Sequence, residues 1–255
     1  EEQIKLTEQF LRDGYLIFPV ENLIYLQNIK DFLIKQITSI LTLNAGSDID
    51  ILNEFHTVVG QANINQIRLN LIDALNTRGE THKELFWLAQ SKISDLVGNE
   101  LAMQRRINLS IQIPKDETSV LDIHRDTDSG NSPFEVVLWL PLVDCYQTKS
   151  MFILPKHIEK ESSSLLRNDK INTTDDLQQE FQSDLNYLNV PYGHAVLFTH
   201  TAYHGNTINK ERETRWSMNV RFKGLFTPYG DKLVGETFMP IQKRAATQIG
   251  YSEIG

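Results

Sequence analysis

The sequence predicts an α+β protein that is mainly β after its first hundred residues, with a β-sandwich or barrel behind a helical N-terminal cover. Up to about residue 104, apolar residues recur at helical spacing. After residue 104, short β-rich runs alternate with polar turns. Helices followed by many short strands are typical of a β core with helices packed on one side.

Four helices are expected in the first hundred residues. Gly14 ends the first helix, and a short strand at 15–20 follows it. Thr7 is the expected N-cap of the first helix, and Gly98 lies just past the last one. The expected helices are 6–13, 22–43, 64–76 and 81–97.

The strands are expected after residue 104. The run 106–113 alternates strictly between apolar and polar residues, which is typical of a half-buried strand. The other expected strands are 121–126, 135–143, 151–154, 194–199 and 214–222. Between them, 156–192 is a long polar insertion, interpreted either as a lid or as a surface insertion, with a helix cap at 172–175.

The length of 255 residues favours one domain. We divide it into mainly helical support (1–104), a β core (105–225) and a C-terminal extension (226–255). The net charge of −8 argues against a nucleic-acid partner, and no apolar run is long enough for a membrane span. Cys145 is the only cysteine, and the first residues show no signal-peptide pattern, so a cytoplasmic location is expected.

One ordered set of residues predicts a metal site. His124 and Asp126 are two apart in an expected strand, so their side chains share a face. His204 precedes Gly205, and Arg215 follows eleven residues after His204. Two imidazoles and one carboxylate suit Fe(II) and leave three coordination positions open for a 2-oxo acid and O₂. Arg215 offers a fork of donors that matches the far carboxylate of such a co-substrate.

Simpler interpretations stand beside this one. His124 and Asp126 could form a buried hydrogen-bonded pair without metal. His200 competes with His204, because the two would share a helix face, and Asp128 competes with Asp126. We prefer His204 because of Gly205 and the distance to Arg215.

A second set of polar residues predicts the pocket. Arg215, Ser217, Asn219 and Arg221 share one strand face, so Arg221 either meets an anionic substrate or forms a structural salt bridge. Three further polar positions on the strand 106–113 either line the pocket or face water: Asn108, Ser110 and Gln112.

The ordered set resembles the phytanoyl-CoA dioxygenase (PhyH) family of Fe(II)/2-oxoglutarate oxygenases. The family's closing motif, His-Gly with a later Asn and Arg, matches His204-Gly205, Asn209 and Arg215. Its N-terminal signature resembles 10–19, and its Trp-Leu-Pro-Leu strand resembles 139–142. The match spans most of the chain. The stretch from His124 to Pro155 is also similar to bacterial oxygenases of carbohydrate biosynthesis.

This resemblance implies a double-stranded β-helix, the cupin-like jelly roll. It implies iron on His124, Asp126 and His204 and the co-substrate on Arg215, with Asn206 in place of the usual Ser. Gln112 is the third predicted co-substrate residue, and the predicted substrate residues are Arg221, Asn108 and Ser110. Related halogenases have a small residue in place of the metal carboxylate, so Asp126 favours hydroxylation.

The predicted function is therefore a dioxygenase that uses Fe(II), 2-oxoglutarate and O₂ and releases succinate and CO₂. The polar inward positions favour a small polar substrate, a sugar or nucleotide sugar, with an amino acid derivative as the alternative. Two other classes compete with this function. One is a cupin-like sugar-nucleotide isomerase or epimerase with a His–Asp acid–base pair, and the other is a non-catalytic binding module.

Overall fold

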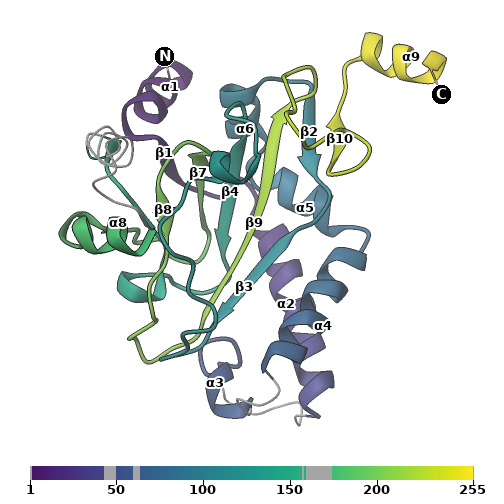
Figure 1. Cartoon of the computed structure of the whole chain (residues 1–255). Helices are drawn as coiled ribbons and strands as arrows, with labels where there is room; N and C mark the ends of the chain where they lie inside the picture. Colours follow the sequence, from purple (N-terminus) through teal and green to yellow (C-terminus); the bar gives the residue numbers. More distant parts are fainter. Residues whose placement is uncertain (1, 43–49, 60–63, 157, 159–173, 255) are drawn as a thin grey trace.

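The computed structural model describes residues 2–42, 50–59, 64–156, 158 and 174–254, and its strands form two antiparallel sheets (Figure 1). The seven-stranded major sheet has the order β1-β7-β4-β9-β2-β10, and β3 also pairs with β9. Its strands are β1 (Tyr15–Pro19), β2 (Leu101–Gln104), β3 (Asn108–Gln112), β4 (Val136–Pro141), β7 (His194–Thr199), β9 (Arg215–Gly224) and β10 (Phe238–Gln242). The minor sheet has the order β6-β5-β8, with β5 (Phe152–Ile153), β6 (Asn186–Tyr187) and β8 (His204–Gly205).

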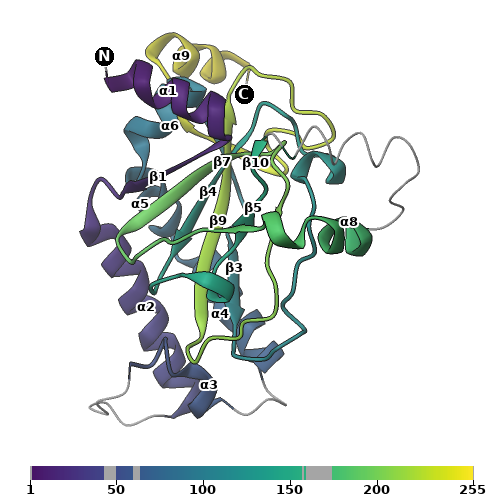
Figure 2. The ribbon, with the colours of Figure 1, turned by 90° about the vertical axis from the view of Figure 1, so that its left-hand side faces the viewer.

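Helices cover the strands from both sides. Figure 2 shows α2 and α5 on one side of the strands and α8 on the other. No helix among the described residues is long and apolar enough to cross a membrane. The α-helices are α1 (Glu2–Asp13), α2 (Leu23–Leu41), α3 (Phe55–Val58), α4 (Ile64–Thr77), α5 (Thr81–Trp87), α6 (Gln90–Val97), α8 (Thr174–Glu180) and α9 (Ala245–Ile254). The 3₁₀ helices are η2 (Asp126–Ser129), η3 (Gln147–Lys149) and η4 (Gln182–Asp184).

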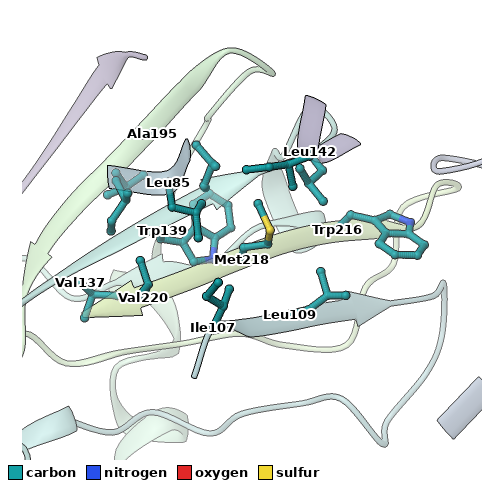
Figure 3. Close-up of a cluster of buried hydrophobic side chains, with 14 of the residues drawn as sticks. Leu85, Ile107, Leu109, Val137, Trp139, Leu142, Ala195, Trp216, Met218 and Val220 are labelled. Atoms are coloured by element: carbon teal, nitrogen blue, oxygen red, sulfur yellow. The ribbon is translucent and has the colours of Figure 1, made fainter. Parts of the chain in front are cut away.

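Strand β9 separates the apolar core from a polar cavity. Its residues Trp216, Met218 and Val220 are almost completely buried, and Figure 3 shows them in one apolar cluster with side chains that include Leu109 of β3. The alternate residues of β9, starting with Arg215, line a cavity on the other face. This division follows from the two-residue repeat of a strand, and it confirms the predicted alternation of β9.

The helical predictions are confirmed with three changes. The side chain of Asn22 accepts a hydrogen bond from the Ile24 amide at 3.1 Å and caps α2. The expected helix 81–97 is two helices, because the chain leaves helical geometry at Ala89. Thr7 is not an N-cap, since α1 already begins at Glu2 and the Thr7 hydroxyl donates back to the Gln3 carbonyl. The third change is the presence of α3 and α9, which the sequence pattern did not predict.

The strand pairing crosses the boundaries expected from the sequence. Strand β2 lies in the segment expected to be helical support and β10 in the expected C-terminal extension, yet the two pair with each other in the major sheet. Strand β6 lies in the expected insertion 156–192 and pairs with β5. Within that insertion, 157 and 159–173 lie outside the described residues, and these include the first two residues of the expected cap at 172–175. Residues 43–49 also lie outside the described residues.

Candidate metal centre and co-substrate pocket

The two histidines of the predicted metal site are held together by their own backbones. The His124 amide donates to the His204 carbonyl at 2.9 Å, and the His204 amide donates to the His124 carbonyl at 3.0 Å. The predicted strand 121–126 is wrong, because His124 forms only an isolated bridge and Asp126 begins η2. A long-range pairing, and not a regular strand, therefore brings the site together.

Gly205 makes this pairing possible. A Cβ atom at Gly205 would lie 2.7 Å from the Leu121 carbonyl oxygen and 2.8 Å from the ring of Phe152. The chain beside His124 therefore approaches β8 more closely than a side chain at position 205 would allow. Close packing thus requires a glycine after His204, and the neighbouring sequence alone does not reveal this requirement.

Backbone carbonyls orient both imidazole rings. The Nδ1 atom of His124 lies 2.7 Å from the Asp122 carbonyl oxygen, and the Nδ1 atom of His204 lies 3.0 Å from that of Ala202. A carbonyl can only accept, so each Nδ1 carries the proton and each Nε2 keeps a lone pair for a metal. Burial lowers the pKa of His204 to about 4, so its ring is neutral at neutral pH.

Arg221, on strand β9 of the major sheet, holds the side chain of Asp126 in place. The Nη2 atom of Arg221 donates to Asp126 Oδ1 at 2.8 Å, and Arg221 Nη1 donates to Gln104 at 3.1 Å. Burial acts to raise the pKa of Asp126, but the charge and hydrogen bond of Arg221 together with the interactions of His204 and His200 outweigh it, and the net pKa lies below its ordinary value. Arg221 thus forms the salt bridge that the sequence left as one of two alternatives. The carboxylate is ionised, as a metal ligand must be.

His200 lies behind Asp126 and is completely buried. Its Nε2 atom is 3.6 Å from Asp126 Oδ2, and its Nδ1 atom is 3.3 Å from Glu135 Oε2. Burial lowers the pKa of His200 to about 3, so this ring also stays neutral. His200 therefore lies beside the candidate metal carboxylate, between Asp126 and Glu135.

The donor set of His124, Asp126 and His204 fits a divalent metal ion. One ligand atom from each lies within 4.8 Å of the other two, so small side-chain movements would bring all three around one ion. Two imidazoles and a carboxylate on one side of an octahedral ion match the ligand set of non-haem Fe(II) centres, with three positions left open.

Arg215 is a buried cation without an acidic partner among the described residues. It is 3% exposed. Its Nη2 atom donates to the Ser110 hydroxyl at 2.8 Å, and Nη1 donates to the Ser150 carbonyl at 3.4 Å, whereas Nε has no partner. Burial lowers the pKa of Arg215 to about 10, which leaves it protonated. A buried guanidinium in this state favours an anionic ligand.

These residues line one cavity of about 470 Å³ between the two sheets. His204 of the minor sheet and His124, which pairs with it, border the cavity on one side, and Arg215 and Arg221 of the major sheet border it on the other. Its wall is completed by segment 118–121 and by residues of α4, β3, β4, β7 and β9. Among the residues that these elements contribute to the wall are Asn65, Arg68, Asn108, Ser110, Trp139, Ser217 and Asn219.

Two predicted co-substrate residues have other partners. The Gln112 side chain is completely buried, donates to the Thr207 carbonyl and does not line the cavity. Asn206 does line the cavity, but its amide accepts from the Leu121 amide and donates to the Ser119 carbonyl. Through these hydrogen bonds, Gln112 holds the chain at Thr207, and Asn206 holds segment 119–121, which leads to His124.

The sequence pattern missed Arg68, which anchors the cavity wall. All five of its N–H groups donate within the protein: two to the Ile111 carbonyl, one to Asn65 and one each to Thr118 and Asp116. Burial acts to raise the pKa of Asp116, but hydrogen bonds from Thr118, Arg68 and others outweigh it and lower the pKa to about 2. In the sequence, Arg68 looks like an ordinary polar residue of an amphipathic helix.

Comparison with known proteins supports the fold at low sequence identity. No protein-family model and no curated protein matches the sequence. The non-haem α-ketoglutarate-dependent carbocyclase SnoK from nogalamycin biosynthesis has a similar structure, with a TM-score of 0.59 and 15% identity over 93% of this chain and 96% of SnoK. EctD from S. alaskensis, solved with 2-oxoglutarate and 5-hydroxyectoine, has a TM-score of 0.55 and 15% identity over 88% of this chain and 77% of EctD.

HygX from Streptomyces hygroscopicus, solved with nickel and 2-oxoglutarate, has a TM-score of 0.51 and 13% identity over 91% of this chain and 90% of HygX. The predicted fold is thus confirmed: the chain has the jelly-roll, double-stranded β-helix architecture of non-haem iron oxygenases, with helices added to it.

We expect Gly205→Ala to disturb the metal site specifically. The new methyl group would overlap the Leu121 carbonyl and the Phe152 ring, so segment 121–124 must move and His124 with it. The affinity for Ni(II), measured by calorimetry, should fall, and the melting temperature should drop. Gly79→Ala is the matched control, because a Cβ there meets no atom within 4 Å. Equal Ni(II) affinity in both variants would contradict this account of Gly205.

We expect Asp116 to make stability depend on pH. Its pKa is lowered from 3.8 to about 2, so the ionised carboxylate stabilises the fold by about 2 kcal/mol above pH 4. This contribution is lost as the pH falls through the pKa of the folded protein. Urea unfolding from pH 7 to pH 3 should show wild type more stable than Asp116→Asn, with the difference narrowing below about pH 4. A difference that does not change with pH would rule out this role.

Proposed function

We propose that this protein is an Fe(II)- and 2-oxoglutarate-dependent dioxygenase that hydroxylates a small polar molecule and releases succinate and CO₂. The observation that carries the proposal is a complete donor set beside an unpaired buried cation. His124, Asp126 and His204 supply three metal ligands, and Arg215 lines the same cavity without an acidic partner among the described residues. We also propose that the chain acts as a single oxygenase domain.

The residues present fit both implied groups. The imidazole Nε2 atoms are free for the metal because carbonyls hold the Nδ1 protons, and Arg221 keeps the Asp126 carboxylate ionised and oriented. Arg215 would bind the C5 carboxylate of 2-oxoglutarate, with Ser110 holding its guanidinium in place. When bound, Fe(II), 2-oxoglutarate and O₂ together supply the oxidising equivalents for C–H hydroxylation.

The lowered pKa of Asp126 favours this function over acid–base isomerisation. A general base needs a pKa near the working pH, whereas the Arg221 charge helps to keep the pKa of Asp126 below its ordinary value. A low pKa suits a metal ligand, which must lose its proton. A non-catalytic module, in turn, would have no physical need for all three metal ligands.

The polar wall of the cavity supports a sugar or nucleotide sugar as the substrate class. Amide and hydroxyl groups from β3, β9 and α4 face the cavity, and Trp139 offers an apolar surface. Such a mixture of hydrogen-bonding and apolar groups suits a hydroxylated ring better than a fatty acyl chain.

The function is tested by supplying the protein with Fe(II), ascorbate and 2-oxoglutarate. We expect slow release of succinate without substrate and, without oxygen, the weak visible absorption of an Fe(II)–2-oxo acid chelate. Asp126→Ala should abolish both signals, because it removes one of the three ligands. Wild-type protein that binds Fe(II) but shows neither signal would refute the proposed function.

Arg215→Gln should separate co-substrate binding from metal binding. The affinity for 2-oxoglutarate should fall by about a hundredfold, because a charge-assisted pair with a carboxylate is lost. The affinity for Ni(II) should not change, because Arg215 contacts none of the three ligands. Calorimetry measures both affinities, and Arg212→Gln is the control at an exposed arginine three residues away. A similar loss in both variants would exclude Arg215 as the co-substrate anchor.

A further inference from the structure

Two asparagines face each other across the cavity wall. Asn108 of β3 is paired with Asn219 of β9 in the sheet register, and the Nδ2 atom of Asn108 donates to Asn219 Oδ1 at 2.8 Å. Both side chains are half-buried and line the cavity. The hydrogen bond fixes the two amide groups relative to each other, so they form one rigid polar surface.

This amide pair offers a donor beside an acceptor. A primary amide has two N–H donors and one carbonyl acceptor. The hydrogen bond between the two residues uses the Asn108 amino group and the Asn219 carbonyl. The Asn219 amino group and the Asn108 carbonyl have no hydrogen-bond partner among the described residues. A neighbouring donor and acceptor match a hydroxyl group, a vicinal diol or another amide. A carboxylate or phosphate would be repelled by the carbonyl, and an ammonium group by the amino group.

The amide pair lies where a substrate must approach. Side chains that alternate along β9 are about 7 Å apart, and Asn219 stands two residues before Arg221, which contacts Asp126, and four after Arg215. It is therefore close to the candidate metal ligands and away from the co-substrate anchor. Trp139 of β4 is the register partner of Asn219 on its other side and also lines the cavity.

The three arginines of the cavity are already engaged. All five N–H groups of Arg68 donate within the protein. The charge of Arg221 is paired with Asp126, and its two Nη atoms bind Gln104 and Asp126, although its buried Nε has no hydrogen-bond partner. Arg215 is reserved for 2-oxoglutarate in the proposed function. Among the described lining residues, no cation then remains to bind an anionic group of the substrate.

We propose that Asn108 and Asn219 bind the substrate, and that the part of the substrate beside the metal is an uncharged hydroxylated ring. One hydroxyl or diol of the ring binds the amide pair, and an apolar face of the ring packs on Trp139. This inference rests on the proposed function and narrows its substrate class: a sugar ring enters the cavity, and any phosphate of a nucleotide sugar stays outside it.

The inference is tested with three probes that share a six-membered ring and differ in charge. They are cyclohexane-1,2-diol, 2-hydroxycyclohexanecarboxylate and 2-aminocyclohexanol. Saturation-transfer NMR measures their affinities for protein loaded with Zn(II) and N-oxalylglycine, an unreactive analogue of the co-substrate. We expect the diol to bind at least about tenfold more tightly than either charged probe, because a charged group would leave one amide unmatched.

Asn219→Asp should reverse this preference. The new carboxylate replaces the donor, so the amino alcohol should become the tightest of the three probes. Asn70→Asp, on the exposed face of α4, is the control and should keep the order of wild type. The inference is overturned if the carboxylate probe binds wild type as well as the diol, if the diol does not bind, or if Asn219→Asp keeps the wild-type order. Succinate release by wild type reports separately on the proposed function, so the two can fail independently.

Discussion

The backbone pairing of His124 with His204 is the constraint on which the candidate site depends. Eighty residues separate the two histidines, and two hydrogen bonds of 2.9 and 3.0 Å join them. The pairing adds segment 121–124 to the edge of β8, and the Asn206 side chain extends it to Leu121. Because Asp126 follows two residues later, the same contact also places the third ligand. The geometry of the site therefore depends on close approach at Gly205 rather than on a regular strand.

Charge balance explains why the cavity can hold two half-buried arginines, Arg68 and Arg221, beside a candidate metal site. Arg68 is neutralised by Asp116 and Arg221 by Asp126, and each pair ties a loop to a helix or to the major sheet. A buried charge without a partner is costly. Arg215 has no acidic partner among the described residues, so a dicarboxylate ligand would remove an unfavourable interaction as well as add a favourable one. The unpaired cation is thus a stronger indication of a ligand than the size of the cavity.

Sequence reasoning succeeded where a pattern is local. The alternation along β9 and the amphipathic helices α2 and α4 follow from periodicity, and the spacing of His124, Asp126, His204 and Arg215 drew attention to one cavity. It failed where long-range contacts decide the structure. Strands β2 and β10 stabilise each other across more than 130 residues, and Asn206 and Gln112 bind loops that no local pattern identifies. Arg68 anchors the cavity wall through hydrogen bonds to Ile111, Asp116 and Thr118, which lie more than 40 residues after it in the sequence.

The two faces of β9 divide stability from binding. Trp216, Met218 and Val220 pack into the apolar core, and the Trp216 indole also donates to the Leu52 carbonyl at 2.8 Å. The opposite face carries Arg215, Ser217, Asn219 and Arg221 in order along the cavity. One strand therefore sets the distances between Arg215, the proposed co-substrate anchor, Asn219 of the proposed substrate-binding pair, and Arg221, which holds the candidate metal ligand Asp126. Because the other face is packed into the apolar core, the spacing of the polar side chains along the cavity is fixed by the core and not by the polar side chains themselves.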